Sequence, residues 1–87
     1  MSARRVDFTD HAKRKFEILK RLGFSVSMRR VVGVVESPER VDVGWKGRFI
    51  ASARLNREYV LRVVYEKVGD RKVVVTFYPA RRRRYEG

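Results

Sequence analysis

Glu58-Tyr-Val-Leu-Arg-Val-Val-Tyr-Glu66 is followed, after a Gly69-Asp70 pair, by Arg71-Lys-Val-Val-Val-Thr-Phe-Tyr-Pro79. Both segments are rich in β-branched and aromatic residues that alternate with a period of two, which is typical of β-strands. A Gly-Asp pair between two such runs indicates a tight turn. The pattern predicts an antiparallel hairpin whose apolar faces are formed by Tyr59, Leu61, Val63 and Tyr65 in one strand and by Val73, Val75 and Phe77 in the other.

Two further strands are predicted upstream of this hairpin. One runs from Arg40 to Trp45 and ends in a Lys46-Gly47 turn, and the next runs from Phe49 to Leu55 and ends in a turn around Asn56-Arg57. In both, apolar residues occupy every second position. Together with the hairpin they predict an antiparallel meander.

Two helices are predicted before the meander. Thr9-Asp10 offers side-chain oxygens that cap the first helix, and Gly23 ends it. Ser27 caps the second, and Pro38 ends it because the residue before a proline is pushed out of the helical region. The first helix has an apolar stripe of Ala12, Phe16, Leu19 and Leu22.

The order of elements is therefore strand, two helices and four strands, beginning with a short extended segment from Val6 to Phe8. The expected fold class is α+β, with two N-terminal helices packed on a twisted antiparallel sheet of about four strands. The 87 residues suffice for one core. We expect a single domain over residues 1–87, with a basic C-terminal segment at residues 80–87.

The charge of the chain points to an anionic partner. Twenty-two Lys and Arg face ten Asp and Glu, which gives a net charge of +12, while 44% hydrophobic residues exclude a disordered polycation. Such self-repulsion is relieved when a polyanion binds. Nucleic acid, the ribosome or an acidic protein are the expected partners. The alternative is thermal adaptation or a solvated face, although such surfaces usually mix both signs.

The chain has no cysteine, which fits a reducing compartment. No apolar run approaches the roughly 18 residues of a spanning helix, and the N-terminus lacks the apolar segment of a signal peptide. We therefore expect a cytoplasmic protein without membrane contact. One histidine and no cysteine leave only scattered carboxylates as ligands, so no metal and no cofactor are expected.

Arg62 is the first candidate functional residue, because it interrupts an otherwise apolar strand. A guanidinium there requires either a carboxylate partner or an anion site, and the sequence leaves both alternatives open. The candidate acids are Glu36, Asp42 and Glu66. Alternation makes Thr76 or Tyr78 its plausible neighbour across the hairpin.

The arginine run from Arg81 to Arg84 is the second candidate. Guanidinium groups stay protonated and match the geometry of phosphate, and Tyr78 and Tyr85 beside the run offer faces on which bases stack. The alternative is a frayed tail that neutralises phosphates without fixed geometry.

His11 is the third candidate. It lies in the first turn of the first helix, where the helix dipole disfavours protonation and leaves the ring as an acceptor or a base. The alternative is a hydrogen bond to the backbone of a neighbouring strand.

Five segments of the sequence resemble a small uncharacterised prokaryotic family. They are Thr9-Asp-His-Ala12, Ser37-Pro-Glu-Arg40, Leu61-Arg-Val-Val-Tyr65, Val74-Val-Thr-Phe-Tyr-Pro79 and the closing Arg-Arg-Tyr85. In its element order that family is similar to the RelE and BrnT toxins of type II toxin–antitoxin pairs. These toxins are basic endoribonucleases, which in the RelE case cut RNA on the ribosome. The family's usual arginine four residues after the histidine is Lys15 here.

The resemblance implies a metal-independent endoribonuclease. Such an enzyme activates the 2′-hydroxyl, stabilises the phosphorane and protonates the leaving 5′-oxygen. Arg62 and Arg82 would clamp the phosphate, Tyr85 or Tyr78 would place the leaving group, and His11 or a lysine would be the base. Further RNA contacts are expected from Lys15, Lys46, Arg48, Tyr78, Arg81, Arg83 and Arg84.

Two alternatives of other classes fit the same charge pattern. One is a protein that binds nucleic acid or the ribosome without catalysis. The other is a module that docks on an acidic protein, such as an antitoxin. A homodimer is also compatible with the sequence, because an outer strand from Arg40 to Trp45 would leave backbone N–H and C=O groups for a partner.

Overall fold

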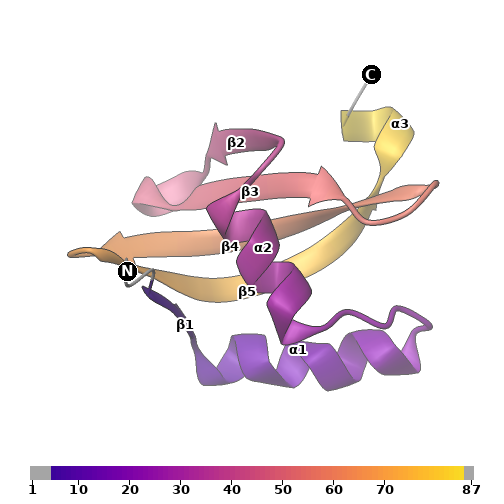
Figure 1. Ribbon diagram of the computed structural model, residues 1–87, viewed down its shortest axis with the longest axis horizontal. Helices are drawn as coiled ribbons and strands as arrows, with labels where there is room; N and C mark the ends of the chain where they lie inside the picture. The colour runs from indigo at the N-terminus through magenta and orange to yellow at the C-terminus, as the bar shows by residue number, and fades with distance from the viewer. Residues whose placement is uncertain (1–4, 86–87) are drawn as a thin grey trace.

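Five strands form one sheet in the order β1-β5-β4-β3-β2, and helices α1 and α2 lie against one face of it (Figure 1). The computed structural model describes residues 5–85, with side chains as far as Arg83. In chain order the elements are β1 (Arg5–Phe8), α1 (Asp10–Arg21), α2 (Met28–Glu36), β2 (Arg40–Val43), the 3-10 turn η1 (Trp45–Gly47), β3 (Phe49–Arg54), β4 (Tyr59–Val68), β5 (Arg71–Arg81) and α3 (Arg82–Tyr85).

The predicted meander is confirmed. Strands β2, β3, β4 and β5 pair antiparallel in sequence order, with Val41 opposite Ala51, Ala51 opposite Val63 and Val63 opposite Phe77. Gly69 has a φ of 63° in the β4–β5 turn, a left-handed conformation that glycine adopts without a steric penalty.

The expected sheet of about four antiparallel strands is wrong. β1 adds a fifth strand that runs parallel to β5, with Asp7 opposite Val73, so the sheet is mixed. Helical structure is also not confined to the N-terminal part, because α3 follows the last strand. The parallel pair depends on contacts between distant residues, such as the hydrogen bond that Thr9 Oγ1 donates to the carbonyl of Val75, 66 residues away (3.3 Å). A local sequence pattern carries no information on such a pairing.

Both predicted helix caps are confirmed. Thr9 Oγ1 accepts a hydrogen bond from the N–H of Ala12 (3.1 Å), and Ser27 Oγ accepts one from the N–H of Arg30 (3.0 Å). The prediction that Leu22 lies on the buried stripe of α1 is wrong, since 68% of this residue is exposed. The helix ends at Arg21, and Phe24 packs on the sheet instead.

The core lies between the two helices and the sheet. Phe16 of α1 packs against Phe77 of β5 with ring centroids 4.7 Å apart, and Phe24 meets Tyr59 edge-on at 5.0 Å. Such tilted and edge-on contacts are the preferred geometries for aromatic pairs. The buried set also includes Ala12, Leu19, Val31, Val34, Val35, Ala51, Leu61, Val63, Tyr65 and Val74.

A β-bulge breaks the alternation that was predicted for β5. Val64 pairs with Thr76 but Tyr65 pairs with Val74, so Val75 is an extra residue on this strand. As a result Val74 and Phe77 are both fully buried, whereas the sequence pattern placed Val73, Val75 and Phe77 on one face. None of the helices within residues 5–85 combines the length and the apolar character needed to cross a membrane.

Candidate nucleic-acid interface

The arginine run begins on the sheet. β5 continues through Pro79 to Arg81, which is opposite Tyr59 of β4. β1 pairs only with residues 71–74 of β5, so no paired strand lies beside Pro79 on that side of β5. A proline, which has no N–H to donate, is therefore tolerated there. The N–H of Arg82 donates to the carbonyl of Glu58 (2.9 Å), and α3 follows at once. Residues 81–83 therefore do not form a frayed tail.

Four arginines surround one hollow at this end of the sheet. Arg57, Arg81, Arg82 and Arg83, which we call the arginine cluster, line a cavity of about 270 Å³ together with Glu58. Arg82 Nη1 donates to the carbonyl of Arg57 (2.8 Å), and the guanidinium of Arg81 lies 5.2 Å from the ring centre of Tyr59. These contacts hold Arg82 against the β3–β4 turn and Arg81 against the first residue of β4, so these two cations have a defined geometry.

Arg57 was not predicted from the sequence as a site residue. It lies in the Asn56-Arg57 turn, and the pairing of Tyr59 with Arg81 brings that turn beside the C-terminal run. The signal that could have found it is the length of the last strand, since only a β5 that extends past Pro79 reaches the turn. The side chains of Arg84 and Tyr85, two predicted site residues, lie outside the described part of the chain.

Arg62 is buried rather than open to a ligand. Only 6% of the residue is exposed, on the sheet face opposite the helices. Its Nε donates to the hydroxyl of Tyr78 (3.2 Å) and its Nη1 donates to Ser52 Oγ (3.2 Å). Nη1 also lies 3.7 Å from Asp42 Oδ2. The geometry favours the structural alternative, in which a carboxylate neutralises the guanidinium, and Tyr78 is its neighbour as predicted.

His11 lies far from the arginine cluster, and Lys15 follows it one turn later on α1. The residues that lead into α1 are held at Val74 of β5 by the N–H of Thr9 (3.0 Å), and His11 follows two residues later. Six residues of β5 lie between Val74 and Arg81, which corresponds to roughly 20 Å. The structure does not bring His11 together with Arg82.

Lys46 and Arg48 also lie away from the cluster, just before the first residue of β3 (Figure 1). Lys46 Nζ is 4.7 Å from the ring centre of Trp45, and Arg48 forms an ion pair with Glu66 (2.9 Å). β2 is an edge strand, as expected for the outer strand, but it ends at Val43. The homodimer in which a second copy of the chain pairs with this strand stays a prediction.

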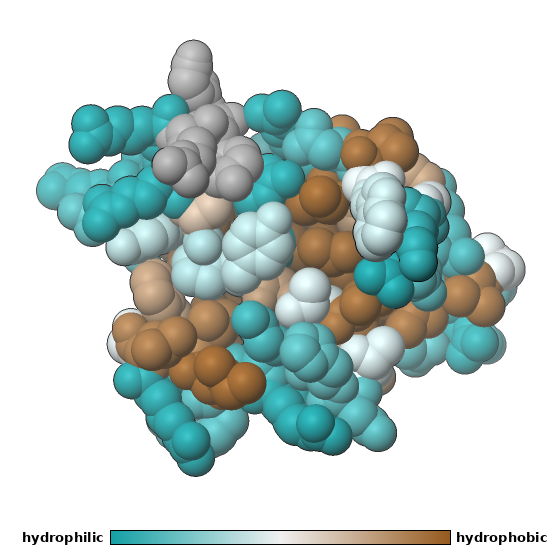
Figure 2. All heavy atoms as spheres, turned by 180° about the vertical axis from the view of Figure 1, so that it is seen from behind, coloured by the Kyte–Doolittle hydropathy of each residue, from teal (hydrophilic) through white to brown (hydrophobic). Residues whose placement is uncertain are grey.

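The face of the sheet opposite the helices is mixed in character. Figure 2 shows apolar residues across the middle of this face and hydrophilic side chains projecting around them. Among the described residues no group of three or more His, Cys, Asp or Glu side chains is arranged to hold a metal ion.

No protein-family model, no curated protein and no solved structure matches this chain significantly. The resemblance to RelE and BrnT toxins therefore stays a prediction from the sequence.

Proposed function

We propose that the protein binds RNA and that the arginine cluster, Arg57 with Arg81 to Arg83, is the phosphate-binding part of the interface. The observation that carries the proposal is the grouping of four arginine residues around one hollow, with Glu58 as its single acidic residue. Guanidinium groups form paired hydrogen bonds to phosphate oxygens and are always charged. Cations that are already positioned lose less conformational entropy when a phosphate binds.

The overall charge supports the same proposal. A chain of 87 residues with a net charge of +12 attracts polyanions over long distances. An acidic protein would be attracted too, but arginine side chains match the geometry of phosphate groups, which nucleic acids present at regular intervals. An RNA target also agrees with the cytoplasmic location expected from the sequence.

The endoribonuclease activity implied by the resemblance stays a second prediction. Of the residues to which it assigns catalytic roles, only Arg82 is described within the arginine cluster. Arg62 is buried in a network of its own, and His11 lies at the other end of β5. Binding without cleavage is therefore the function that we place first.

The proposal is tested by titrating a fluorescently labelled RNA with the wild-type protein and with Arg81→Ala/Arg83→Ala. Both residues are exposed, whereas Arg82 is spared because its side chain anchors the β3–β4 turn. We expect the double variant to bind at least tenfold more weakly, since hydrogen bonds to charged groups contribute roughly 1.5–3 kcal/mol each. The slope of log K against log salt should fall by about 1.4, or about 0.7 for each phosphate contact to a single strand.

The matched control is Lys13→Ala/Arg14→Ala, which removes the same charge from exposed positions on α1. A general charge effect would weaken both double variants equally, and that result would contradict the proposed interface. Gel analysis of the same RNA, with and without a chelator, shows whether it is cut. Cleavage that survives chelation and is lost in Tyr85→Phe would favour the endoribonuclease instead.

A further inference from the structure

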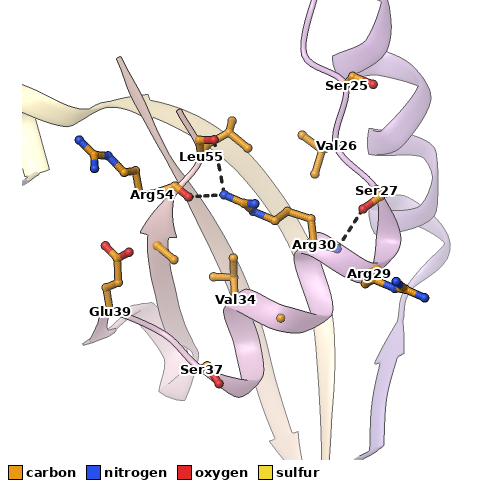
Figure 3. Close-up of a pocket in the computed structure, with 12 residues that line it drawn as sticks. Ser25, Val26, Ser27, Arg29, Arg30, Val34, Ser37, Glu39, Arg54 and Leu55 are labelled. Atoms are coloured by element: carbon orange, nitrogen blue, oxygen red, sulfur yellow. Dashed lines mark hydrogen bonds between the residues drawn. The ribbon is translucent and has the colours of Figure 1, made fainter. Parts of the chain in front are cut away.

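A second and larger cavity lies between α2 and the end of β3. Its volume is about 720 Å³, within the range of pockets that take small organic ligands. The connection before α2, the first turns of α2 and the strand end at Ala53–Leu55 form its walls (Figure 3). We call it the α2–β3 cavity. It is lined by Ser25, Val26, Ser27, Arg29, Arg30, Gly33, Val34, Ser37, Glu39, Ala53, Arg54 and Leu55.

Arg30 is the positioned cation of this cavity. Its side chain reaches from α2 toward β3, where Nη2 donates to the carbonyl of Arg54 and, at 3.4 Å, to that of Leu55 (Figure 3). The Nε and Nη1 groups of this exposed guanidinium have no hydrogen-bond partner among the described residues. Two backbone carbonyls therefore orient the guanidinium while leaving donors for a ligand.

The other walls combine apolar surface with small hydroxyl groups. Val26, Val34 and Leu55 provide the apolar part, and Ser25 and Ser37 provide hydroxyls that can donate or accept hydrogen bonds. Arg29 and Arg54 lie on opposite sides of the cavity and their side chains point away from it (Figure 3), and Glu39 is the one acid in its lining. This mixture suits a flat heterocycle that carries hydrogen-bonding edges and is attached to a phosphate.

The cavity adjoins the arginine cluster. Arg54 and Leu55 line the cavity, and Arg57 of the cluster follows after Asn56 in the same turn. Three residues of extended chain span at most about 11 Å, so the two hollows lie on one end of the molecule. One nucleic-acid strand can reach both.

We infer that the α2–β3 cavity takes an unpaired nucleotide of the RNA strand whose phosphates the arginine cluster binds, so that the protein selects single-stranded over double-stranded RNA. The inference rests on the proposed RNA binding. A base in a duplex is stacked and paired, and it cannot enter a cavity, whereas an unpaired base can be turned out of its strand. Arg30 then donates to the phosphate or to an acceptor on the base.

Gly33 allows the cavity to be filled without a change of charge. It lines the cavity on α2, and a Cβ atom built there meets no atom within 4 Å. Gly33→Phe should therefore occupy the cavity while the helix is kept, and Gly33→Ala is the matched control that leaves it open. Ser25→Phe, on the connection before α2, is a second filling variant from another wall.

The experiment measures the affinity for a short RNA as a single strand and for the same strand annealed to its complement. We expect the wild type to bind the single strand about tenfold more tightly, and both Phe variants to lose about that factor on the single strand alone. Gly33→Ala should lose much less affinity than Gly33→Phe, because it adds a single methyl group to the cavity wall. Circular dichroism identifies any variant that does not fold. If one of the two Phe variants does not fold, the other one tests the inference.

Equal wild-type affinities for the two RNA forms would overturn the inference, and so would Phe variants that keep their single-strand affinity. If Arg81→Ala/Arg83→Ala weakens binding in either case, the proposed function stands without the cavity. A wild type that binds neither RNA form overturns both proposals.

Discussion

Arg62 links four strands of the sheet on the face opposite the helices. Asp42 of β2, Ser52 of β3 and Tyr78 of β5 all contact its guanidinium. The sequence predicted that this arginine needs a counter-ion or an anion site, and Asp42 was one of the acids considered. Which alternative holds could not be predicted, because it depends on the register that places Arg62 opposite Ser52.

Replacing Arg62 should lower the stability of the protein rather than act directly on RNA binding. We expect Arg62→Ala to lower the free energy of unfolding by about 2–4 kcal/mol, because it leaves a void and deprives Asp42 and the Tyr78 hydroxyl of their partner. Arg62→Met, which keeps most of the volume, should cost less. Urea unfolding measures both. An Arg62→Ala protein with wild-type stability and lost RNA binding would instead assign Arg62 to the ligand site.

Tyr65 should make the stability of the protein depend on pH in the alkaline range. Burial raises the pKa of its phenol above the ordinary value of 10.0, so the folded protein holds the proton more tightly than the unfolded chain. This contribution is complete below about pH 10 and is lost as the pH rises through the folded pKa. Urea unfolding of wild type and Tyr65→Phe should show a larger decline for the wild type above about pH 10. Parallel declines would contradict this role.

At the scale of elements, local chemistry predicted more than distant pairing. Thr9 and Ser27 cap their helices as expected because a cap involves residues only three positions apart. The parallel β1–β5 pair and the bulge at Val75 were missed, since both depend on how separate segments meet. The extension of β5 to Arg81 was missed for a related reason. In the sequence, Pro79 indicates the end of a strand. Only the structure tells that β1 does not pair with β5 at this position.

Helix α2 should become more stable when its one glycine is replaced by alanine. Gly33 lies inside the helix and has open space around its missing Cβ. Gly33→Ala should raise the free energy of unfolding by about 0.5–1 kcal/mol, because glycine loses more backbone entropy in a helix. Gly69→Ala is the opposite control and should be destabilising, since its φ is 63°. Loss of stability in Gly33→Ala would mean that the helix has another conformation there.

At the scale of the whole molecule, the basic groups fall into separate sets. The arginine cluster and the α2–β3 cavity share one end, whereas His11 and Lys15 lie on α1 and Lys46 and Arg48 lie beyond the other end of β3. Composition predicts an anionic partner, and the C-terminal run supplies part of the proposed interface. It could not predict Arg30 or Arg57, because a helix and a turn supply them and only the folded sheet brings them to the same end.

The most direct test of this interface is an NMR titration of the ¹⁵N-labelled protein with a single-stranded RNA. The account predicts the largest amide shift changes in residues 25–34, 53–58 and 80–83, and small changes in residues 10–16 and 45–49. Shift changes centred on α1 or on the turn at 45–47, or the absence of any change, would contradict it.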